Sequence, residues 1–380
     1  MRLTRLPLLV GLILSLVVTG PSSFVRGFSA AEIPASLTNQ EFWRLTETLS
    51  EPNGSFRSEN MLSNEMVLAR LMPQVVAAIK PGGVYLGVGP EQNFSYFAAT
   101  KPKIAFITDI RRGNLHVLLM YKALFELSAN RAEFVSRLFS RTLPRTVTAA
   151  SSVREIMDAI WDATPGNEAA YTANLNAIQQ HLTRTRGLPL PPDDVAGIAD
   201  SYRTFYFYGP AMNYSATTAL IPIGSGRNAA TYWDLMTQTG DDGKPLSYLG
   251  SEESFRTVKD MYNRNVIVPL VGDFAGPKTI RAIGDWVRAH GATVSAFYVS
   301  TVEHYLRDGG VMPRFCANVA SLPTDASSVF IRPGNVQQLS MGNAMGPARP
   351  DGSRIMIPPG TPTVGTYQIG VVVPIAGGCG

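Results

Sequence analysis

Two short apolar runs, separated by a glycine turn and a polar stretch, stand out in the pattern of hydrophobic and polar positions. Residues 84–86 form the first run and end in the turn 87–90 (GVGP), and residues 93–100 favour a short helix. The second run, 103–108, closes with Asp109 and two arginines. Runs that are apolar on both faces are typical of buried parallel strands. Strand, glycine turn, helix, strand and acid together predict a nucleotide-binding βαβ unit.

Further apolar runs predict that the same sheet continues much later in the chain. We expect parallel strands at 266–271, 293–299 and 328–331, and an antiparallel edge strand within 365–374, which is the only strand predicted after residue 333. Amphipathic patterns predict helices at 39–49 and 63–80, and a helix that starts at Pro277. The fold class is therefore α/β, with a Rossmann-like, doubly wound and mostly parallel sheet.

About 150 residues between the second and third predicted strands are too many for a loop. Helical patterns cover 114–139, 150–186 and 229–237, with a short possible strand at 219–223 before the glycine turn 224–228. Residues 198–208 are rich in aromatic side chains, which favours core packing, and the alternative is stacking on an adenine or an aromatic substrate. We expect a mainly helical insertion at 113–265 that caps one side of the sheet. The sheet domain is then formed by residues 32–112 and 266–380, and the latter part ends in a tail rich in glycine and proline.

The amino terminus has the pattern of a secretory signal. Arg2 and Arg5 precede a 13-residue apolar core at 6–18, and small residues at 29–31 (SAA) suit a cleavage site. A core of this length is shorter than the ~20 residues that span a bilayer. We expect residues 1–31 to be removed and the protein to be exported, periplasmic or secreted. The alternative is an uncleaved anchor, which would be the chain's one contact with a membrane.

Loss of this segment changes the charge of the protein. Its three arginines are accompanied by no acid, so the net charge falls from +4 to +1. Nucleic acid is therefore not an expected partner, whereas a small-molecule ligand is. Cys316 and Cys379 are the only cysteines. In an oxidising compartment they form a disulfide or remain two buried thiols, and with four scattered histidines they do not predict a metal site.

The glycine turn departs from the dinucleotide fingerprint in a way that points to a ligand without phosphate. Gln92 stands at the third glycine position, Pro90 lacks an N–H group, and Glu91 brings a negative charge. All three disfavour a pyrophosphate. At these residues the chain resembles the Rossmann-like S-adenosylmethionine-dependent methyltransferases. It resembles more narrowly an uncharacterised exported bacterial family with the motifs YLGVGPEQN, ITDIRR, VGDFAGP and FYVSTVEHYL, over residues 42–333.

The resemblance implies a cofactor site at the carboxyl ends of the strands. Gly87 and Gly89 would let the backbone approach S-adenosylmethionine, and Asp109, 22 positions after Gly87, would accept hydrogen bonds from the ribose. Asp273 would lie near the adenine or the amino group. The other candidate cofactor-binding residues of the strand ends are Glu91, Asn93, Ser300 and Thr301.

The segment after the strand at 293–299 holds the candidate catalytic residues. Together with Ser300 and Thr301, Glu303 and His304 would face the methyl group and its acceptor. His304 is the natural base for a hydroxyl acceptor because its ordinary pKa is ~6.5. Asp273, Glu303 and His304 can also be read as a metal site, which their spacing does not require. Polar residues at 60–65 favour capping of the next helix, and the alternative is that they face the cofactor.

Two classes of function remain open. The first is a small-molecule methyltransferase whose acceptor the sequence does not identify. The second is an exported, non-catalytic binding module for a ligand or a protein on a degenerate methyltransferase scaffold. The second class arises because S-adenosylmethionine is not expected where an export signal sends the chain.

Overall fold

The computed structural model describes residues 32–56, 59–63, 68–164, 168–214, 230–333, 345–348, 354–356, 370–375 and 379. The predicted signal segment at 1–31, and the short strand at 219–223 with its glycine turn, lie outside these residues. Among the helices that the structure describes, none combines the length and the apolar character needed to cross a membrane.

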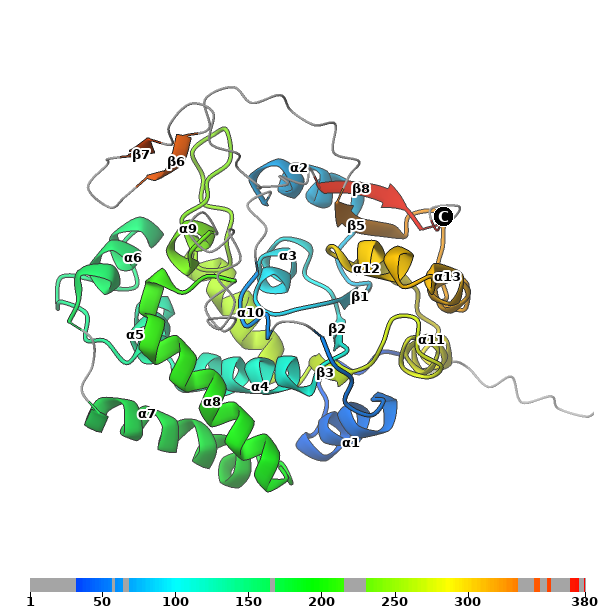
Figure 1. Ribbon diagram of the computed structural model, residues 1–380, viewed down its shortest axis with the longest axis horizontal. Helices are drawn as coiled ribbons and strands as arrows, with labels where there is room; N and C mark the ends of the chain where they lie inside the picture. Colours follow the sequence, from blue (N-terminus) through cyan, green and yellow to red (C-terminus); the bar gives the residue numbers. More distant parts are fainter. Residues whose placement is uncertain are drawn as a thin grey trace, which may run out of the picture.

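A six-stranded sheet forms the centre of the molecule (Figure 1). Its strands are β1 (Val84–Gly87), β2 (Ile104–Asp109), β3 (Ile267–Val271), β4 (Val294–Tyr298), β5 (Val329–Pro333) and β8 (Gly370–Pro374). They are ordered β3-β2-β1-β4-β5-β8, and all neighbours are parallel except β5 and β8. The predictions of an α/β fold, a mostly parallel sheet and an antiparallel edge strand are confirmed, and this strand order is compatible with a Rossmann-like fold.

The strand order explains where a ligand can enter. The chain moves outward from β1 to β3 and then returns to the other side of β1 with β4, so the order reverses between β1 and β4. Ligands of open α/β sheets bind beyond the carboxyl ends of the strands at such a reversal. Pro269 lies in β3, which pairs with β2 and with no other strand that the structure describes. An edge strand is the position where a residue without an N–H group is tolerated.

Helices cover both faces of the sheet. On one face lie α3 (Gln92–Thr100), α4 (Arg112–Leu127) and α10 (Glu252–Asn263), and on the other lie α11 (Thr279–Ala289) and α13 (Met312–Ala320) (Figure 1). Aromatic rings mark the two layers. Tyr85 of β1 packs edge-on against Phe97 of α3, with 4.9 Å between the ring centroids. On the other face, the ring centroids of Phe106 of β2 and Trp286 of α11 lie 5.3 Å apart.

The described residues between β2 and β3 are mainly helical. After α4 come α5 (Arg131–Phe139), α6 (Val153–Asp162), α7 (Glu168–Gln180), a π-helix (His181–Thr185), α8 (Pro192–Tyr208), a 3₁₀ turn (Gly209–Ala211), α9 (Tyr232–Met236) and α10. The pattern at 114–139 comprises two helices and not one. The break occurs because Asn130 caps α5, accepting a hydrogen bond from the Glu133 amide with its side chain.

The remaining elements include two corrections to the sequence prediction. They are α1 (Asn39–Leu49), α2 (Leu68–Ala78), α12 (Val302–Asp308) and the antiparallel pair β6 (Met345–Ala348) and β7 (Arg354–Met356), which the prediction of a single late strand missed. Helix α11 begins at Thr279 and not at Pro277. The Glu51 carboxylate accepts from the amides of Lys278 and Thr279, at 2.7 and 2.9 Å, and so caps the helix there.

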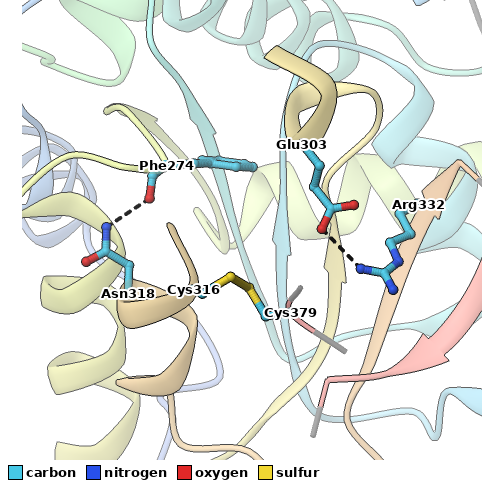
Figure 2. Close-up of a disulfide and its surroundings, with 6 residues drawn as sticks. All are labelled: Phe274, Glu303, Cys316, Asn318, Arg332 and Cys379. Atoms are coloured by element: carbon cyan, nitrogen blue, oxygen red, sulfur yellow. Dashed lines mark hydrogen bonds and ion pairs between the residues drawn. A yellow bond between two sulfur atoms is a disulfide. The ribbon is translucent and has the colours of Figure 1, made fainter. Parts of the chain in front are cut away.

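A disulfide joins Cys316 of α13 to Cys379, across a separation of 63 residues (Figure 2). Of the two alternatives that the sequence left open, the structure contains the paired form. The bond attaches the carboxyl-terminal end to the helical layer beside β4 and β5.

Candidate functional site

A cavity of about 170 Å³ lies at the carboxyl ends of β1, β2, β3 and β4. Five of the eight predicted cofactor-binding residues line it: Gly89, Asp109, Asp273, Ser300 and Thr301. Segment 60–63, which precedes α2, and helix α12 provide further walls. The parallel register of the sheet therefore brings together residues that are up to 212 positions apart in the sequence.

The two glycines of the turn have different tasks. Gly89 lies in the left-handed region, with φ of +75°, and a Cβ built on it would meet no atom within 4 Å. This conformation requires glycine or a strained residue. A Cβ on Gly87 would instead lie 2.1 Å from Asn93 Oδ1 and 2.8 Å from a ring atom of Tyr85. Gly89 therefore opens the turn toward the cavity, whereas Gly87 makes room for the packing behind it.

Asn93, at the start of α3, holds the turn in shape. Its Nδ2 donates to the carbonyls of Val88, Gly89 and Pro90 at 3.0, 3.2 and 2.9 Å, and its Oδ1 accepts from the Tyr85 hydroxyl at 3.0 Å. The side chain is buried and does not line the cavity. Asn93 and Gly87 thus build the turn from behind and do not face a ligand.

Glu91 connects the turn to the segment that precedes α2. Its carboxylate is fully buried and accepts from the Ser63 amide with both oxygens at 3.1 Å. Glu91 does not line the cavity, but Asn60 and Ser63 do. Residues 60 and 63 therefore line the cavity, and the interpretation that this segment faces a cofactor stays a prediction. Asn64 and Glu65 lie outside the described residues.

The end of β2 carries a buried ion pair. Asp109 accepts from the Arg111 amide with Oδ1 at 3.0 Å and from Arg111 Nη2 with Oδ2 at 3.2 Å. A carboxylate offers about four acceptor positions, so it retains capacity for ribose hydroxyls. The Thr108 hydroxyl also belongs to this wall and is buried without a hydrogen-bond partner among the described residues.

The loop after β3 is held rigidly. Asp273 Oδ1 accepts from the Ala275 amide at 2.9 Å, and Asn318 of α13 donates to the carbonyls of Phe274 and Gly276 at 2.8 Å each (Figure 2). These bonds fix one oxygen of the carboxylate and the backbone that follows Asp273. Asp273 therefore presents its second oxygen from a defined position.

After β4 the chain turns sharply at Ser300, whose φ is +47°. Non-glycine residues in this region are uncommon and carry backbone strain, which tends to collect at functional sites. Ser300 and Thr301 both line the cavity, as do Val302, Tyr305 and Leu306 of α12. The strained turn directs α12 along the cavity wall.

The predicted catalytic residues lie on the other sides of α12. Positions 302, 305 and 306 share one helical face, so Glu303 and His304 point elsewhere. Glu303 is buried and pairs with Arg332 at 3.1 Å (Figure 2), and His304 is 67% exposed and 3.5 Å from Asp308. The structure does not bring them to the cavity.

Arg111 and Thr108 are cavity residues that the sequence reasoning did not select. Arg111 was visible as the first arginine after Asp109, and Thr108 as the polar residue that ends an apolar strand. Among the described residues of the lining, Asp109, Asp273 and Arg111 are charged, and together they carry one net negative charge. Within the part of the chain that the structure describes, no group of histidine, cysteine and acidic residues could hold a metal ion.

Comparison of the chain with curated proteins gives no match. A family model matches residues 60–188 and 221–347, which include most of the cavity wall. The chain therefore belongs to the family described as Domain of unknown function (DUF7790).

Proposed function

We propose that the cavity binds an adenosyl ligand, S-adenosylmethionine or its demethylated product, in a methyltransferase-like protein whose small-molecule acceptor is unknown. The observation that carries the proposal is the meeting of Gly89, Asp109, Asp273, Ser300 and Thr301 in one cavity. Gly89 lets the backbone approach the ligand, Asp109 accepts from the ribose hydroxyls, and Asp273 accepts from the adenine or the amino group. Ser300 and Thr301 face the methyl group and its acceptor.

The charge of the cavity supports this choice of ligand. S-adenosylmethionine carries a sulfonium, an ammonium and a carboxylate, and so has a single net positive charge. The described residues of the lining carry one net negative charge, from Asp109, Asp273 and Arg111. NAD has a net negative charge, which the two carboxylates repel, and Pro90 offers its pyrophosphate no N–H group.

The lining also restricts the chemistry. In methyl transfer the acceptor forms a bond to the methyl carbon, the carbon–sulfur bond breaks, and its electron pair neutralises the sulfonium. In-line positioning supplies most of the acceleration. Among the residues that the structure describes, the lining contains no histidine, cysteine or lysine. Acceptors that are nucleophilic without loss of a proton therefore suit this site best, since His304 lies outside it.

A second candidate is an exported binding module on the same scaffold. Two observations favour it: the disulfide between Cys316 and Cys379, which is typical of an oxidising compartment, and the position of Glu303 and His304 outside the cavity. In this case the cavity still recognises an adenosyl-like small molecule but transfers nothing.

The test is calorimetric titration of residues 32–380 with S-adenosylmethionine, S-adenosylhomocysteine and NAD. We expect binding of both adenosyl compounds in preference to NAD. Absence of heat with either adenosyl compound at high micromolar concentration contradicts the proposed ligand, and tighter binding of NAD contradicts our interpretation of the turn. Intact-mass analysis of the protein from its native host separately tests export, with an amino terminus expected near Glu32.

A further inference from the structure

We propose that Arg111 and the first turn of α4 form an anion subsite at the edge of the cavity, and that Glu59 is its internal competitor. The subsite takes a carboxylate or a phosphate carried by the adenosyl ligand. The inference rests on the proposed function for the identity of that ligand, but not for the existence of the subsite.

The start of α4 combines two arginines with the amino-terminal end of a helix, and both arginines already contact carboxylates. Arg111 is the N-cap residue and Arg112 the first helical residue, the first turn contains no acidic side chain, and the Arg112 amide donates to Asn53 Oδ1 at 2.7 Å. The amino-terminal end of a helix carries a partial positive charge of about half a unit. The helix end and Arg111 both favour an anion here, and Asp109 and Glu59 already contact Arg111.

Two buried donors at this point lack partners among the described residues. The Arg111 side chain is 5% exposed, and it contacts Asp109 through Nη2 and Glu59 through Nη1, while its Nε has no acceptor. The Thr108 hydroxyl is also buried without a hydrogen-bond partner among the described residues, and both residues line the cavity. Unpaired buried donors are costly in a folded protein, and a bound anion would satisfy both.

The contacts of Glu59 show that a carboxylate fits beside Arg111. Its carboxylate oxygen Oε2 lies 3.4 Å from Arg111 Nη1 and 3.0 Å from the place where a side chain on Gly113 would begin. The absence of a side chain at Gly113 therefore leaves room for a carboxylate at the first turn of α4. The Glu59 side chain is 55% exposed, so its ion pair is long, screened by solvent and easily displaced.

A matched control exists one residue away. Glu47 approaches Arg112 Nη2 at the same distance, 3.4 Å, with a side chain that is 47% exposed. Arg112 does not line the cavity and is already bound to Asp194 by two hydrogen bonds of 2.6 Å. Glu59→Gln and Glu47→Gln thus make the same chemical change beside neighbouring arginines, of which only one faces the ligand.

The experiment compares affinities by calorimetry for the wild-type chain and both variants. We expect Glu59→Gln to bind S-adenosylmethionine about two- to fivefold more tightly, by loss of an exposed competing charge, and to leave decarboxylated S-adenosylmethionine unchanged. Glu47→Gln should change neither. The second arm compares the affinities for adenosine 2′-monophosphate and adenosine. If Glu59→Gln raises affinity in this arm and not in the first, the anion of the subsite is a phosphate. Two outcomes overturn the subsite. In the first, Glu59→Gln changes the affinity for each anionic compound and for its non-anionic counterpart equally. In the second, Glu59→Gln changes no affinity in either arm.

Failure of the proposed function gives a different result. If neither the wild-type chain nor the variants bind any adenosyl compound, the proposed ligand is wrong, and the subsite is tested with inorganic phosphate alone. Thermal unfolding at constant ionic strength should then show a larger phosphate-dependent rise in Tm for Glu59→Gln than for the wild-type chain or Glu47→Gln. Equal rises in all three proteins overturn the subsite independently.

Discussion

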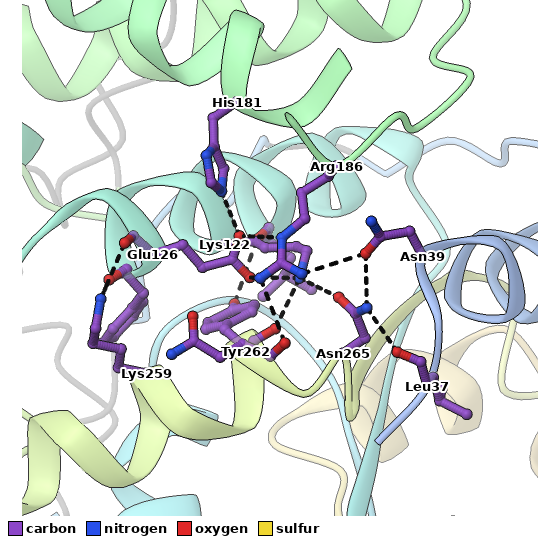
Figure 3. Close-up of polar contacts among 12 residues, drawn as sticks. Leu37, Asn39, Lys122, Glu126, His181, Arg186, Lys259, Tyr262 and Asn265 are labelled. Atoms are coloured by element: carbon purple, nitrogen blue, oxygen red, sulfur yellow. Dashed lines mark hydrogen bonds and ion pairs between the residues drawn. The ribbon is translucent and has the colours of Figure 1, made fainter. Parts of the chain in front are cut away.

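The cavity and a charged cluster on α4 both bury ionised side chains, and they differ in how many polar atoms are paired. In the cluster, Lys122 donates from Nζ to Glu126 Oε1 at 2.8 Å, to the Tyr262 carbonyl at 2.8 Å and to Asn265 Oδ1 at 2.5 Å (Figure 3). Its three protons therefore all have acceptors. In the cavity, by contrast, Thr108 Oγ1 and Arg111 Nε have none among the described residues.

The other half of the cluster is equally complete. Glu126 accepts from His181 at 2.6 Å and from Arg186 at 2.8 Å, side chains that belong to the π-helix and the residue after it (Figure 3). Burial alone would raise the pKa of Glu126, but these bonds and the charge of Lys122 outweigh it and lower the pKa. A saturated network of this kind specifies how α4, the π-helix and α10 dock.

The comparison separates two uses of buried charge. Where all donors and acceptors meet within the protein, the charges fix the fold and offer nothing to a ligand. Where some remain unpaired beside a cavity, the protein has accepted a cost that a ligand can offset. The largest effects on stability are therefore expected in the cluster, and the largest effects on binding in the cavity.

The largest expected effect is that of Glu126→Gln. The change keeps the shape of the side chain but leaves buried Lys122 without a counter-ion, which should lower the free energy of unfolding by ~3–5 kcal/mol. Denaturant titration measures it. The control is Asp260→Asn, which breaks an exposed pair with Arg264 and should cost less than ~1 kcal/mol. Similar losses in both variants would show that the saturated cluster has no special weight.

Asp194 extends the comparison to pH. It is buried on α8 and bound to Arg112 and His116. Burial would raise its pKa, but the bonds from Arg112 and His116 outweigh it and lower the pKa from 3.8 to about 2. Because the pKa is depressed in the folded state, the stabilisation is present above pH 3.8 and is lost as the pH falls through about 2.

We therefore expect Asp194→Asn to cost ~2–3 kcal/mol at neutral pH, by loss of charged hydrogen bonds. The difference between the variant and the wild-type chain should shrink between pH 4 and pH 2 and vanish below that range. Urea unfolding at a series of pH values measures this difference. A difference that stays constant over the range would mean that Asp194 acts through packing and not through its charge.

The two glycines of the turn separate an effect on stability from an effect on ligand binding. Gly87→Ala should lower the free energy of unfolding by ~1–3 kcal/mol, because the new methyl group meets Asn93, which four hydrogen bonds hold in place. Gly89→Ala should cost only ~1 kcal/mol, for the left-handed conformation, since its methyl group meets no protein atom. Ligand affinity should fall more in Gly89→Ala. The reverse ranking of affinities would place the ligand behind the turn.

The strands and the polar residues at their ends were predictable because buried runs and their terminating residues are local in sequence. The wrong predictions at the candidate site concern the direction in which side chains point. The phase of α12, which turns Glu303 and His304 away, depends on the strained turn at Ser300, and no pattern reports it. The burial of Glu91 depends on the Ser63 amide, 28 residues away. Which atoms remain unpaired is a property of the assembled fold, so the sequence could not single out Thr108.

The smallest expected effect tests the comparison most directly. The change in the free energy of unfolding should have opposite signs for two matched threonines. Thr108→Val removes a buried hydroxyl that has no partner among the described residues, and should raise the free energy of unfolding by ~1 kcal/mol while weakening ligand binding. Thr279→Val removes a buried hydroxyl that donates to the Val271 carbonyl at 3.1 Å, and should lower that free energy by ~1 kcal/mol. Guanidinium titration measures both stabilities, and calorimetry with S-adenosylmethionine measures the affinities. If both variants lose stability equally, the Thr108 hydroxyl is paired in solution and no donor is held ready at the end of β2.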